Sequence, residues 1–235
     1  MYLNRQLNEA VYMCQPKGFI QPGNEGLICK LLKGVYGLKQ SRQVWHQLLK
    51  SKLKKIRFKA GEADSTVYFR YSQNGSLEIA GWYVDDGLLA ANSTKAMDNM
   101  VRDINRSFDI QDLGEPDHLL GIRISHNRDM GTISISQPSF ISTIAKQFNI
   151  SPGRQINSPM DATSELRAST VDDDLIDIPY TSLIGSVNYC SVATRPDISF
   201  AVNKCAQFTS WPNTTHWEAA KRIIQYLLHT KEYGI

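Results

Sequence analysis

Two neighbouring aspartates, Asp85 and Asp86, lie between short apolar runs, and this arrangement constrains the fold more than any other feature of the chain. Segments 66–71 and 77–84 are rich in β-branched and aromatic residues and flank an Asn-Gly dipeptide, which is typical of a tight hairpin turn. A third apolar run, 88–91, follows shortly after the aspartates. We therefore predict three consecutive β-strands, with both carboxylates at the junction between the second and the third.

Adjacent carboxylates at such a junction suit a hard divalent cation. Successive side chains of a regular strand point to opposite faces, so only a bend lets Asp85 and Asp86 reach the same cleft. Mg²⁺ takes a few carboxylate oxygens together with substrate phosphates, and two-metal phosphoryl transfer normally adds a carboxylate from a different strand. As a bare string, Asp-Asp-Gly is also typical of a solvent-exposed turn. The apolar runs on both sides favour a functional site, because a surface turn has less need of buried strands.

The positive charge of the chain is concentrated in one segment. Residues 27–61 contain ten basic side chains and no acidic one, although the whole chain carries a net charge of only +3. Such a block is the electrostatic pattern of a surface that binds phosphates. A solvated helix face without a ligand explains the same charge equally well, and both interpretations stay open at this point.

The spacing of apolar residues predicts a mixed first half and a helical last third. Helices are expected at 40–56, 97–108, 140–148, 180–192, 196–208 and 217–228, and a second hairpin at 119–124 and 132–136. Ser93 suits the N-cap of the second helix. Segment 151–179 is polar and is expected to be a linker or a long surface loop. This order of elements predicts an α+β fold rather than a regular βαβ alternation.

Composition excludes several classes of protein. With 42% hydrophobic and 21% charged residues, the chain is too apolar to be intrinsically disordered, and it contains no run of about 20 apolar residues that would cross a membrane. The four cysteines, Cys14, Cys29, Cys190 and Cys205, form no Cys-x-x-Cys pair. We therefore expect four buried thiols in a reducing compartment instead of disulfides or zinc. None of the five histidines is expected to be a ligand or a general base.

Six groups of residues, in order along the chain, resemble the reverse transcriptases of copia-type LTR retrotransposons. Tyr83-Val84-Asp85-Asp86, followed by Gly-Leu-Leu-Ala-Ala, is similar to the YVDD box of that family. The other groups are residues 2–19, residues 35–40 with Trp45, Asp112-Leu113-Gly114, Leu119-Leu120-Gly121-Ile122, and a C-terminal signature of Pro179-Tyr180, Gly185-Ser186, residues 194–198 and His216-Trp217. Together they span almost the whole chain.

The resemblance implies a role for each matching residue. Asp85 and Asp86 would be the catalytic carboxylates that bind Mg²⁺ or Mn²⁺, with Asp85 as the primary ligand. The incoming nucleotide would contact Tyr2, Tyr36, Gly37 and Lys39, and Tyr2 would exclude a 2′-hydroxyl by its bulk. The primer end would contact Leu120, Gly121 and Ile122. Template and nucleotide phosphates would contact the basic segment, with Lys30, Lys33, Arg42, Lys50 and Lys54 as the candidates.

The resemblance also implies an architecture and a reaction. Residues 1–136 would form a reverse transcriptase palm with part of the fingers, and residues 137–235 a helical thumb-like region containing the polar linker 151–179. The activity would be RNA-directed DNA polymerisation, in which a primer 3′-hydroxyl attacks the α-phosphate of a deoxynucleotide. The implied partners are an RNA or DNA template-primer and dNTPs, without a membrane. The implied location is a cytoplasmic virus-like particle or the nucleus.

Departures from the family pattern keep an alternative open. The first metal-binding Asp of the family lies shortly before the aromatic residue that Tyr2 matches, at a position that would precede residue 1. Arg42-Gln43 replaces a Pro-Arg pair, and no RNase H segment is expected. The alternative is a non-catalytic remnant that binds nucleic acid through its basic face, which we favour for the isolated chain. A nucleotide cyclase with a similar carboxylate hairpin is a weaker alternative, because a cyclase has no primer to hold.

Overall fold

The computed structural model describes residues 6–35, 38–72, 74–108, 110–161, 165–173 and 178–235, without the side chains of residues 6–8 and 39–42. It contains both helices and sheets, in agreement with the mixed α and β class that we predicted. The chain divides into two compact units, residues 1–114 and 115–235. The boundary between these compact units lies before residue 136, where we predicted that the polymerase palm ends. That subdomain boundary stays a prediction. No helix among the described residues is long and apolar enough to cross a membrane.

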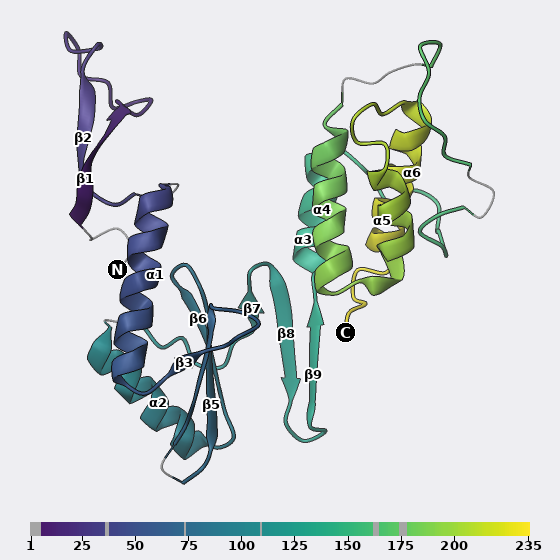
Figure 1. The fold of residues 1–235 in the computed structure, drawn as a ribbon. Helices are drawn as coiled ribbons and strands as arrows, with labels where there is room; N and C mark the ends of the chain where they lie inside the picture. The colour runs from purple at the N-terminus through teal and green to yellow at the C-terminus, as the bar shows by residue number, and fades with distance from the viewer. Residues whose placement is uncertain (1–5, 36–37, 73, 109, 162–164, 174–177) are drawn as a thin grey trace. The chain divides into compact units, whose positions relative to one another are not determined.

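The first unit contains a four-stranded antiparallel sheet, in which β3, β5 and β6 are labelled in Figure 1. The strand order is β3-β4-β5-β6. The strands are β3 (Lys59–Ala60), β4 (Val67–Tyr71), β5 (Leu77–Tyr83) and β6 (Asp86–Ala91). Gly75, between β4 and β5, has a φ of +79°, a left-handed conformation that glycine adopts without steric cost. The predicted hairpin and the third strand are therefore confirmed.

Helices α1 (Lys39–Lys55) and α2 (Thr94–Ser107) pack their apolar faces against this sheet. The buried side chains of this first core are Trp45, Leu49, Leu53, Phe58, Tyr68, Ala80, Met100, Ile104 and Phe108. The three that come from α1 recur every four residues, which places them on one face of the helix. The helix predicted at 40–56 is confirmed by this pattern of burial.

Polar contacts fix both ends of α2. The side chain of Ser93 accepts a hydrogen bond of 3.3 Å from the amide of Ala96, as expected for the predicted N-cap. At the other end, the Lys52 ammonium donates a hydrogen bond to the carbonyl of Ser107 and lies 4.7 Å from the ring centroid of Phe108. A cation beside the last carbonyls of a helix is favourable in the field of the helix dipole. Lys52 of the basic segment therefore joins α1 to α2.

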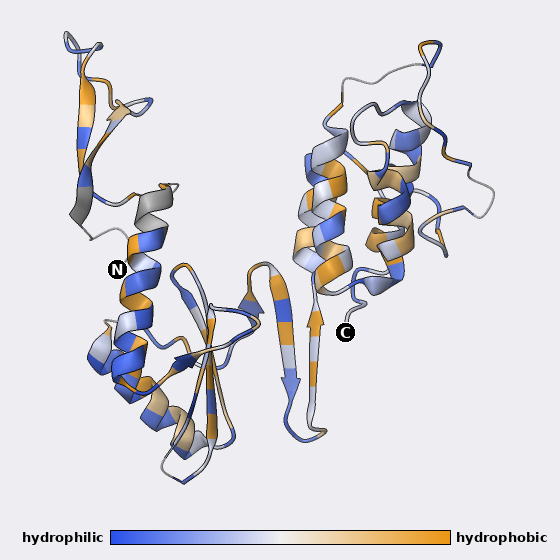
Figure 2. Ribbon diagram, in the orientation of Figure 1, coloured by the Kyte–Doolittle hydropathy of each residue, from blue (hydrophilic) through white to orange (hydrophobic). Residues whose placement is uncertain are grey.

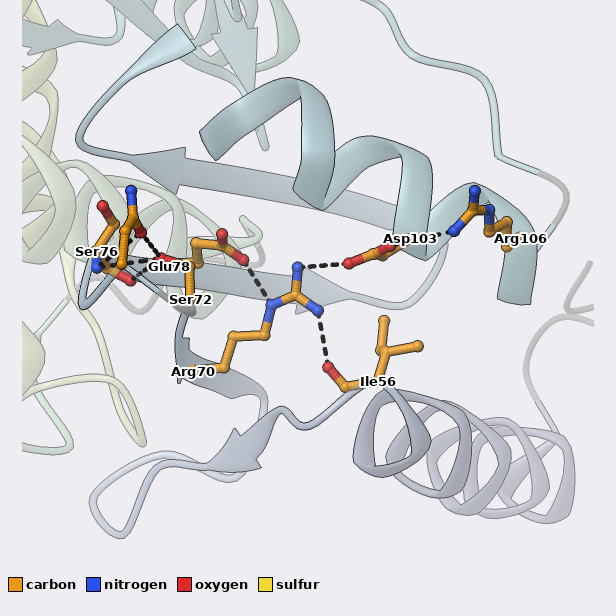
Figure 3. Close-up of polar contacts among 8 residues, drawn as sticks. Ile56, Arg70, Ser72, Ser76, Glu78, Asp103 and Arg106 are labelled. Atoms are coloured by element: carbon orange, nitrogen blue, oxygen red, sulfur yellow. Dashed lines mark hydrogen bonds and ion pairs between the residues drawn. The ribbon is translucent and has the colours of Figure 1, made fainter. Parts of the chain in front are cut away.

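A buried ion pair links the sheet to both helices. Arg70 on β4 and Glu78 on β5 are register partners, and their charged groups lie 2.5 Å apart. The same guanidinium donates a hydrogen bond of 2.8 Å to the carbonyl of Ile56 and another of 2.8 Å to Asp103 on α2 (Figure 3). The side chains of Arg70 and Glu78 are only 11% and 2% exposed. These contacts offset part of the cost of removing both charges from water.

Strands β1 (Gln6–Cys14) and β2 (Ile28–Lys33) form a separate two-stranded antiparallel sheet. The register pairs Cys14 with Ile28, so the neighbouring Cys29 points to the opposite face. Cys14 is exposed and Cys29 is partly exposed. The prediction of four buried thiols was therefore wrong for this pair, because a two-stranded ribbon offers little volume in which to bury a side chain.

The second unit combines a three-stranded sheet with a helical bundle. The antiparallel sheet has the order β7 (His118–Leu119), β8 (Ile122–Asn127) and β9 (Thr132–Ser136), and hydrophobic residues alternate with hydrophilic ones along β8 (Figure 2). The helices are α3 (Pro138–Gln147), α4 (Tyr180–Ala193), α5 (Ser199–Ala206) and α6 (Thr214–His229), with a 3₁₀ turn, η2 (Pro196–Ile198), before α5. Cys190 and Cys205 lie in the core between these helices, and burial raises the pKa of their thiols to about 12 and about 11.

Two predicted boundaries in this unit were wrong. The strand predicted at 119–124 is interrupted, because Leu120 and Gly121 have φ values of +53° and +79° and form a tight turn between β7 and β8. Helix α6 begins earlier than predicted, because Asn213 and His216 form a capping box at its first turn. Both differences arise from local hydrogen bonding and turn geometry that apolar spacing does not report.

Arg195, the residue before η2, is buried, with 1% of its surface exposed. Its guanidinium forms two hydrogen bonds with Asp197, of 2.9 and 2.7 Å, and two with Thr230, of 2.9 and 2.6 Å. The rings of Tyr226 and Tyr233 lie 5.5 and 5.6 Å from it. Burial alone raises the pKa of Asp197, but hydrogen bonds from Arg195 and Tyr226 hold it below its ordinary value. The network joins η2 to the end of α6.

The segment predicted as a polar linker contains no helix or strand in its described residues, 151–161, 165–173 and 178–179. Parts of it are nevertheless attached to the helices. Nε2 of His216 lies 2.9 Å from the carbonyl oxygen of Arg167, and the Ser169 hydroxyl donates a hydrogen bond of 2.7 Å to the carbonyl of Trp211. The described parts of the segment therefore form surface loops, and residues 167–169 pack on the helical part of the same unit.

Candidate functional site

The two aspartates lie at the hairpin between β5 and β6, where Tyr83 pairs with Asp86 and leaves Val84 and Asp85 as the two turn residues. We call Val84, Asp85 and Asp86 the acidic turn. Val84 has a φ of +53°, in the left-handed region. Two-residue hairpin turns need such a φ and normally place glycine, asparagine or aspartate there, so a β-branched residue is strained by about 1–3 kcal/mol. Contacts around the turn have to hold this conformation.

Trp45 of α1 supplies one such contact. Its indole Nε1 donates a hydrogen bond of 2.6 Å to the carbonyl of Val84. The indole is buried and packs edge-on against Phe108, with 6.1 Å between the ring centroids. Trp82 on β5 lies 6.2 Å from the same ring. An aromatic cluster of three residues therefore supports the acidic turn from the helix-covered face of the sheet.

Packing against Trp82 explains why the residue after the two aspartates, Gly87, is a glycine. Gly87 is the register partner of Trp82, so the two residues face the same side of the sheet. A Cβ atom at position 87 would lie 2.8 Å from the indole ring of Trp82. The indole thus occupies the space that any larger residue would need, and the glycine is explained by packing.

Asp85 and Asp86 are both exposed. Their carboxylates are hard oxygen donors of the kind that bind Mg²⁺ and Mn²⁺. Within the described ranges, no group of three or more His, Cys, Asp and Glu side chains is placed to hold a metal ion. The donor chemistry of the acidic turn therefore fits a divalent cation, whose remaining ligands would be substrate oxygens, water or residues outside the described part.

A cavity of about 450 Å³ lies beside the acidic turn. Trp45, Trp82 and Val84 line it together with the polar side chains of His46 and Thr66. Its volume falls in the range of small-molecule binding sites. The sequence did not single out His46, because a histidine beside a buried tryptophan in a helix carries no signal of its own.

The predicted phosphate-binding lysines fall on two elements of the first unit. Lys30 and Lys33 lie on β2, and Lys50 and Lys54 lie on α1, and all four are exposed. The last two are four residues apart, so they share the side of α1 that faces solvent. Their exposure fits both original interpretations, a phosphate-binding surface and a solvated helix face.

Several predicted site residues lie outside the described part of the chain. Nothing is described of Tyr2, Tyr36 and Gly37, and the side chains of Lys39 and Arg42 are not described. Their roles beside the nucleotide and the template stay predictions.

Leu120, Gly121 and Ile122, the predicted primer-contacting residues, lie at the turn between β7 and β8 in the second unit. The hydroxyl of Tyr189 on α4 donates a hydrogen bond of 2.7 Å to the carbonyl of Leu120. The Tyr189 ring packs edge-on against Phe140 on α3, with centroids 5.2 Å apart. The turn is therefore anchored to helices of its own unit, a role of Tyr189 that the sequence did not reveal.

Comparison with known proteins finds relatives along the whole chain. Residues 1–162 match a family model described as reverse transcriptase (RNA-dependent DNA polymerase). The chain is 34% identical over 236 residues to the retrovirus-related Pol polyprotein from transposon TNT 1-94 of Nicotiana tabacum. It is 34% identical over 231 residues to the putative transposon Ty5-1 protein of Saccharomyces cerevisiae, and 32% identical over 234 residues to the Pol polyprotein from transposon RE1 of Arabidopsis thaliana.

The extent of these matches differs between the relatives. They cover 97%, 98% and 100% of this chain, respectively. They cover 74% of the yeast protein, but only 18% of the tobacco polyprotein and 16% of the Arabidopsis one. The chain thus corresponds to a segment of the two polyproteins. No solved structure matches it.

Proposed function

Since the chain belongs to the reverse transcriptase (RNA-dependent DNA polymerase) family, in the form carried by copia-type retrotransposons, we propose that its acidic turn serves template-directed DNA synthesis. The observation that carries this proposal is the turn itself. Asp85 and Asp86 are presented by a strained residue, Val84, whose carbonyl is held by the buried indole of Trp45. Strained backbone that is held by its surroundings is characteristic of functional sites, whereas a surface turn has no need of it.

The reaction would join a primer 3′-hydroxyl to the α-phosphate of a deoxynucleotide. Asp85 and Asp86 would hold Mg²⁺ or Mn²⁺, which stabilises the negative charge on the attacking and leaving oxygens when it is bound. The protein's own part would be positioning, because a fixed turn keeps both carboxylates in place before the substrates arrive. Lys50 and Lys54 would bind template phosphates on the exposed side of α1.

We assign the subdomains of a polymerase on the same basis. The sheet β3–β6 with α1 and α2 would be the palm, because it carries the acidic turn. The β1–β2 ribbon would belong to the fingers and the bundle α3–α6 to the thumb. Residues 120–122 would contact the primer end, and the hydrogen bond from Tyr189 to Leu120 supports this role, since it fixes the main chain of that turn.

Primer extension tests the assignment. The assay would use an RNA template, a DNA primer, dNTPs and Mg²⁺ or Mn²⁺, with the longest polypeptide that contains the chain, because the chain matches only a segment of the Pol polyproteins. Asp85→Asn keeps the shape of the side chain and removes its charge. Asp98→Asn makes the same change at an exposed position of α2 and is the matched control.

We expect Asp85→Asn to lower extension at least about 10²-fold, as does the loss of other groups that stabilise transition-state charge. Binding of the template-primer should be largely unchanged, and Asp98→Asn should extend normally. Near-normal extension by Asp85→Asn, or an equal loss in Asp98→Asn, would contradict the role of Asp85.

One observation favours a second candidate function for the isolated chain. Lys30 and Lys33 on β2 and Lys50 and Lys54 on α1 are exposed, and such a basic surface binds nucleic acid without any metal site. On this basis, the chain alone would bind nucleic acid without extending a primer. RNA binding with no metal-dependent incorporation would support that function. Template-dependent incorporation by the purified chain would reject it.

A further inference from the structure

We propose that a second cavity of the first unit binds the phosphate groups of a nucleic-acid strand, at a place distinct from the acidic turn. This cavity has a volume of about 550 Å³ and includes Ser72 and Asn74, at the connection between β4 and β5. The acidic turn lies at the opposite end of β5, whose seven residues span roughly 20 Å. The two places therefore share a sheet but no lining residue.

Basic side chains outnumber acidic ones in the lining of this second cavity. It contains four basic side chains, Lys55, Arg57, Arg70 and Lys95, and two acidic ones, Glu78 and Asp103. The basic residues come from three elements: the end of α1 with the residues after it, β4, and the first turn of α2. An excess of positive charge in a concave, polar site focuses the potential and attracts anions.

Arg70 is the fixed part of the cavity. Figure 3 shows its guanidinium between Glu78 and Asp103. The two ion-pair distances are 2.5 and 2.8 Å. A third contact, to the carbonyl of Ile56, sets its orientation. Arg106 lies 3.8 Å from the other carboxylate oxygen of Asp103, so Arg70 and Arg106 together balance the charges of the two acidic side chains of the lining.

The other cations of the cavity are available for a ligand. Lys55, Arg57 and Lys95 are exposed, and none of them forms an ion pair with another described residue. The first turn of α2 contains no acidic side chain, although the positive end of the helix dipole favours one there. Lys95 instead adds positive charge at that end. The three exposed cations, together with the positive end of the helix dipole, would therefore attract an anion into the cavity.

The backbone of Arg57 offers a way to test its charge separately from its conformation. Its φ is +69°, in the position just beyond the end of α1 where glycine or asparagine is usual. Glycine would adopt this conformation with less strain. The conformation therefore gives no reason for an arginine at this position, and the substitution Arg57→Gly separates its charge from its conformation.

The charge pattern favours a strand of nucleic acid over a single phosphate ion. Lys50 and Lys54 precede Lys55 and Arg57 on the exposed side of α1 and its end. Positive charge therefore continues from the cavity along the helix, which suits a ligand with several phosphates in a row.

The first test measures the affinity of the full chain for a short single-stranded RNA by fluorescence anisotropy at several salt concentrations. The variants are Arg57→Gly and Lys95→Gln. The control is Arg102→Gln, which removes the same charge from an exposed position of α2 outside the cavity. Each cavity variant should make the slope of log affinity against log salt less negative by about 0.7, the value for one lost contact to a single-stranded phosphate. Arg102→Gln should leave the slope unchanged.

A second measurement separates a binding role from a structural one. Arg57→Gly should be at least as resistant to urea as the unchanged chain, because it removes strain, while its RNA affinity falls. Weaker RNA binding without any loss of stability is a result that a purely structural role of Arg57 does not produce. A loss of stability together with unchanged RNA affinity would overturn the proposal.

A third arm identifies the source of the phosphate. Amide NMR signals of residues 93–96 and of Arg57 are followed during titration with inorganic phosphate and, separately, with the RNA. Shifts with RNA at concentrations where phosphate has no effect support a strand, and equal shifts with both support a site for free phosphate groups. Absence of shifts with either ligand, an unchanged salt slope in both cavity variants, or an equal change in Arg102→Gln would overturn the site.

Discussion

The indole Nε1 of Trp45 donates a hydrogen bond of 2.6 Å to the carbonyl of Val84, 39 residues further along the chain. Val84 has a positive φ in the turn that presents Asp85 and Asp86. The contact therefore joins a strained turn residue to a buried side chain of α1. The backbone turn that carries both carboxylates is thus bonded to an aromatic residue of another element.

Replacing Trp45 by phenylalanine should loosen the acidic turn. The Trp45→Phe side chain keeps an aromatic ring but loses the donor to Val84 and part of the buried volume, which should destabilise the first unit by about 1–3 kcal/mol. Urea unfolding measures this loss. The matched control is Trp211→Phe, since Trp211 is 52% exposed and its change should cost less than about 0.5 kcal/mol. Equal stability of both variants would show that the indole does not hold the turn.

Gly87 and Gly81 form a matched pair for testing the packing beside the acidic turn. A Cβ at position 87 would lie 2.8 Å from the ring of Trp82, whereas a Cβ at position 81 would meet nothing within 4 Å. Gly87→Ala should therefore displace the indole and destabilise the protein by about 1–3 kcal/mol. Gly81→Ala should be neutral or slightly stabilising, because alanine reduces the entropy of the unfolded chain. Thermal unfolding of the two variants, together with tryptophan fluorescence, distinguishes these outcomes.

The buried pair of Arg70 and Glu78 should show strong energetic coupling. Arg70→Met leaves the Glu78 carboxylate buried without its partner, and we expect a loss of about 3–5 kcal/mol. Combining it with Glu78→Leu removes both charges and should recover part of that loss. A double-mutant cycle in urea measures the coupling. If the double variant were as unstable as the sum of the single ones, the pair would not be coupled.

The second unit should lose stability in mild acid because of His216. Its Nδ1 accepts a hydrogen bond of 3.1 Å from the amide of Asn213, which requires the neutral ring with its proton on Nε2, facing the carbonyl of Arg167. Burial lowers the pKa of His216 below its ordinary value of 6.5, although the contact with Arg167 opposes this effect. The unfolded chain therefore binds a proton before the folded one does. The contribution to stability is present above about pH 6.5 and declines as the pH falls below it.

Urea unfolding between about pH 8 and about pH 5 measures this decline. His216→Gln cannot titrate, so its stability should vary less over the same range. The pKa values of Asp173 and Asp197 lie below the ordinary value of 3.8, so these carboxyl groups become protonated only below the pH range of this experiment. An identical pH dependence in His216→Gln and the unchanged chain would refute the assignment.

Much of the framework around the candidate site was predictable from the sequence. The Asn-Gly dipeptide and the alternating apolar residues located β4 and β5, and the spacing of Trp45, Leu49 and Leu53 located α1. The order of short motifs identified the family. Turn formation and helical periodicity depend on residues that are close in the chain, and a motif is recognised from residue types alone. No tertiary information is therefore needed to find these features.

The contacts between side chains of different elements were not predictable from local sequence. No local pattern indicates that Trp45 meets Val84, or that Gly87 lies against the ring of Trp82. The exposure of Cys14 was predicted wrongly, because burial depends on which elements pack around a residue and not on the type of residue.

The sequence by itself therefore determined the family, the secondary-structure elements near the acidic turn, and the chemistry that two adjacent aspartates offer. The tertiary structure decided which aromatic side chains support that turn. It also decided which cations of the basic segment form contacts inside the protein, such as Lys52, and which are exposed to solvent, such as Arg57. The physical reason is range. Turn chemistry and periodicity act over a few residues, whereas a hydrogen bond or a buried charge depends on distances between segments that only folding brings together.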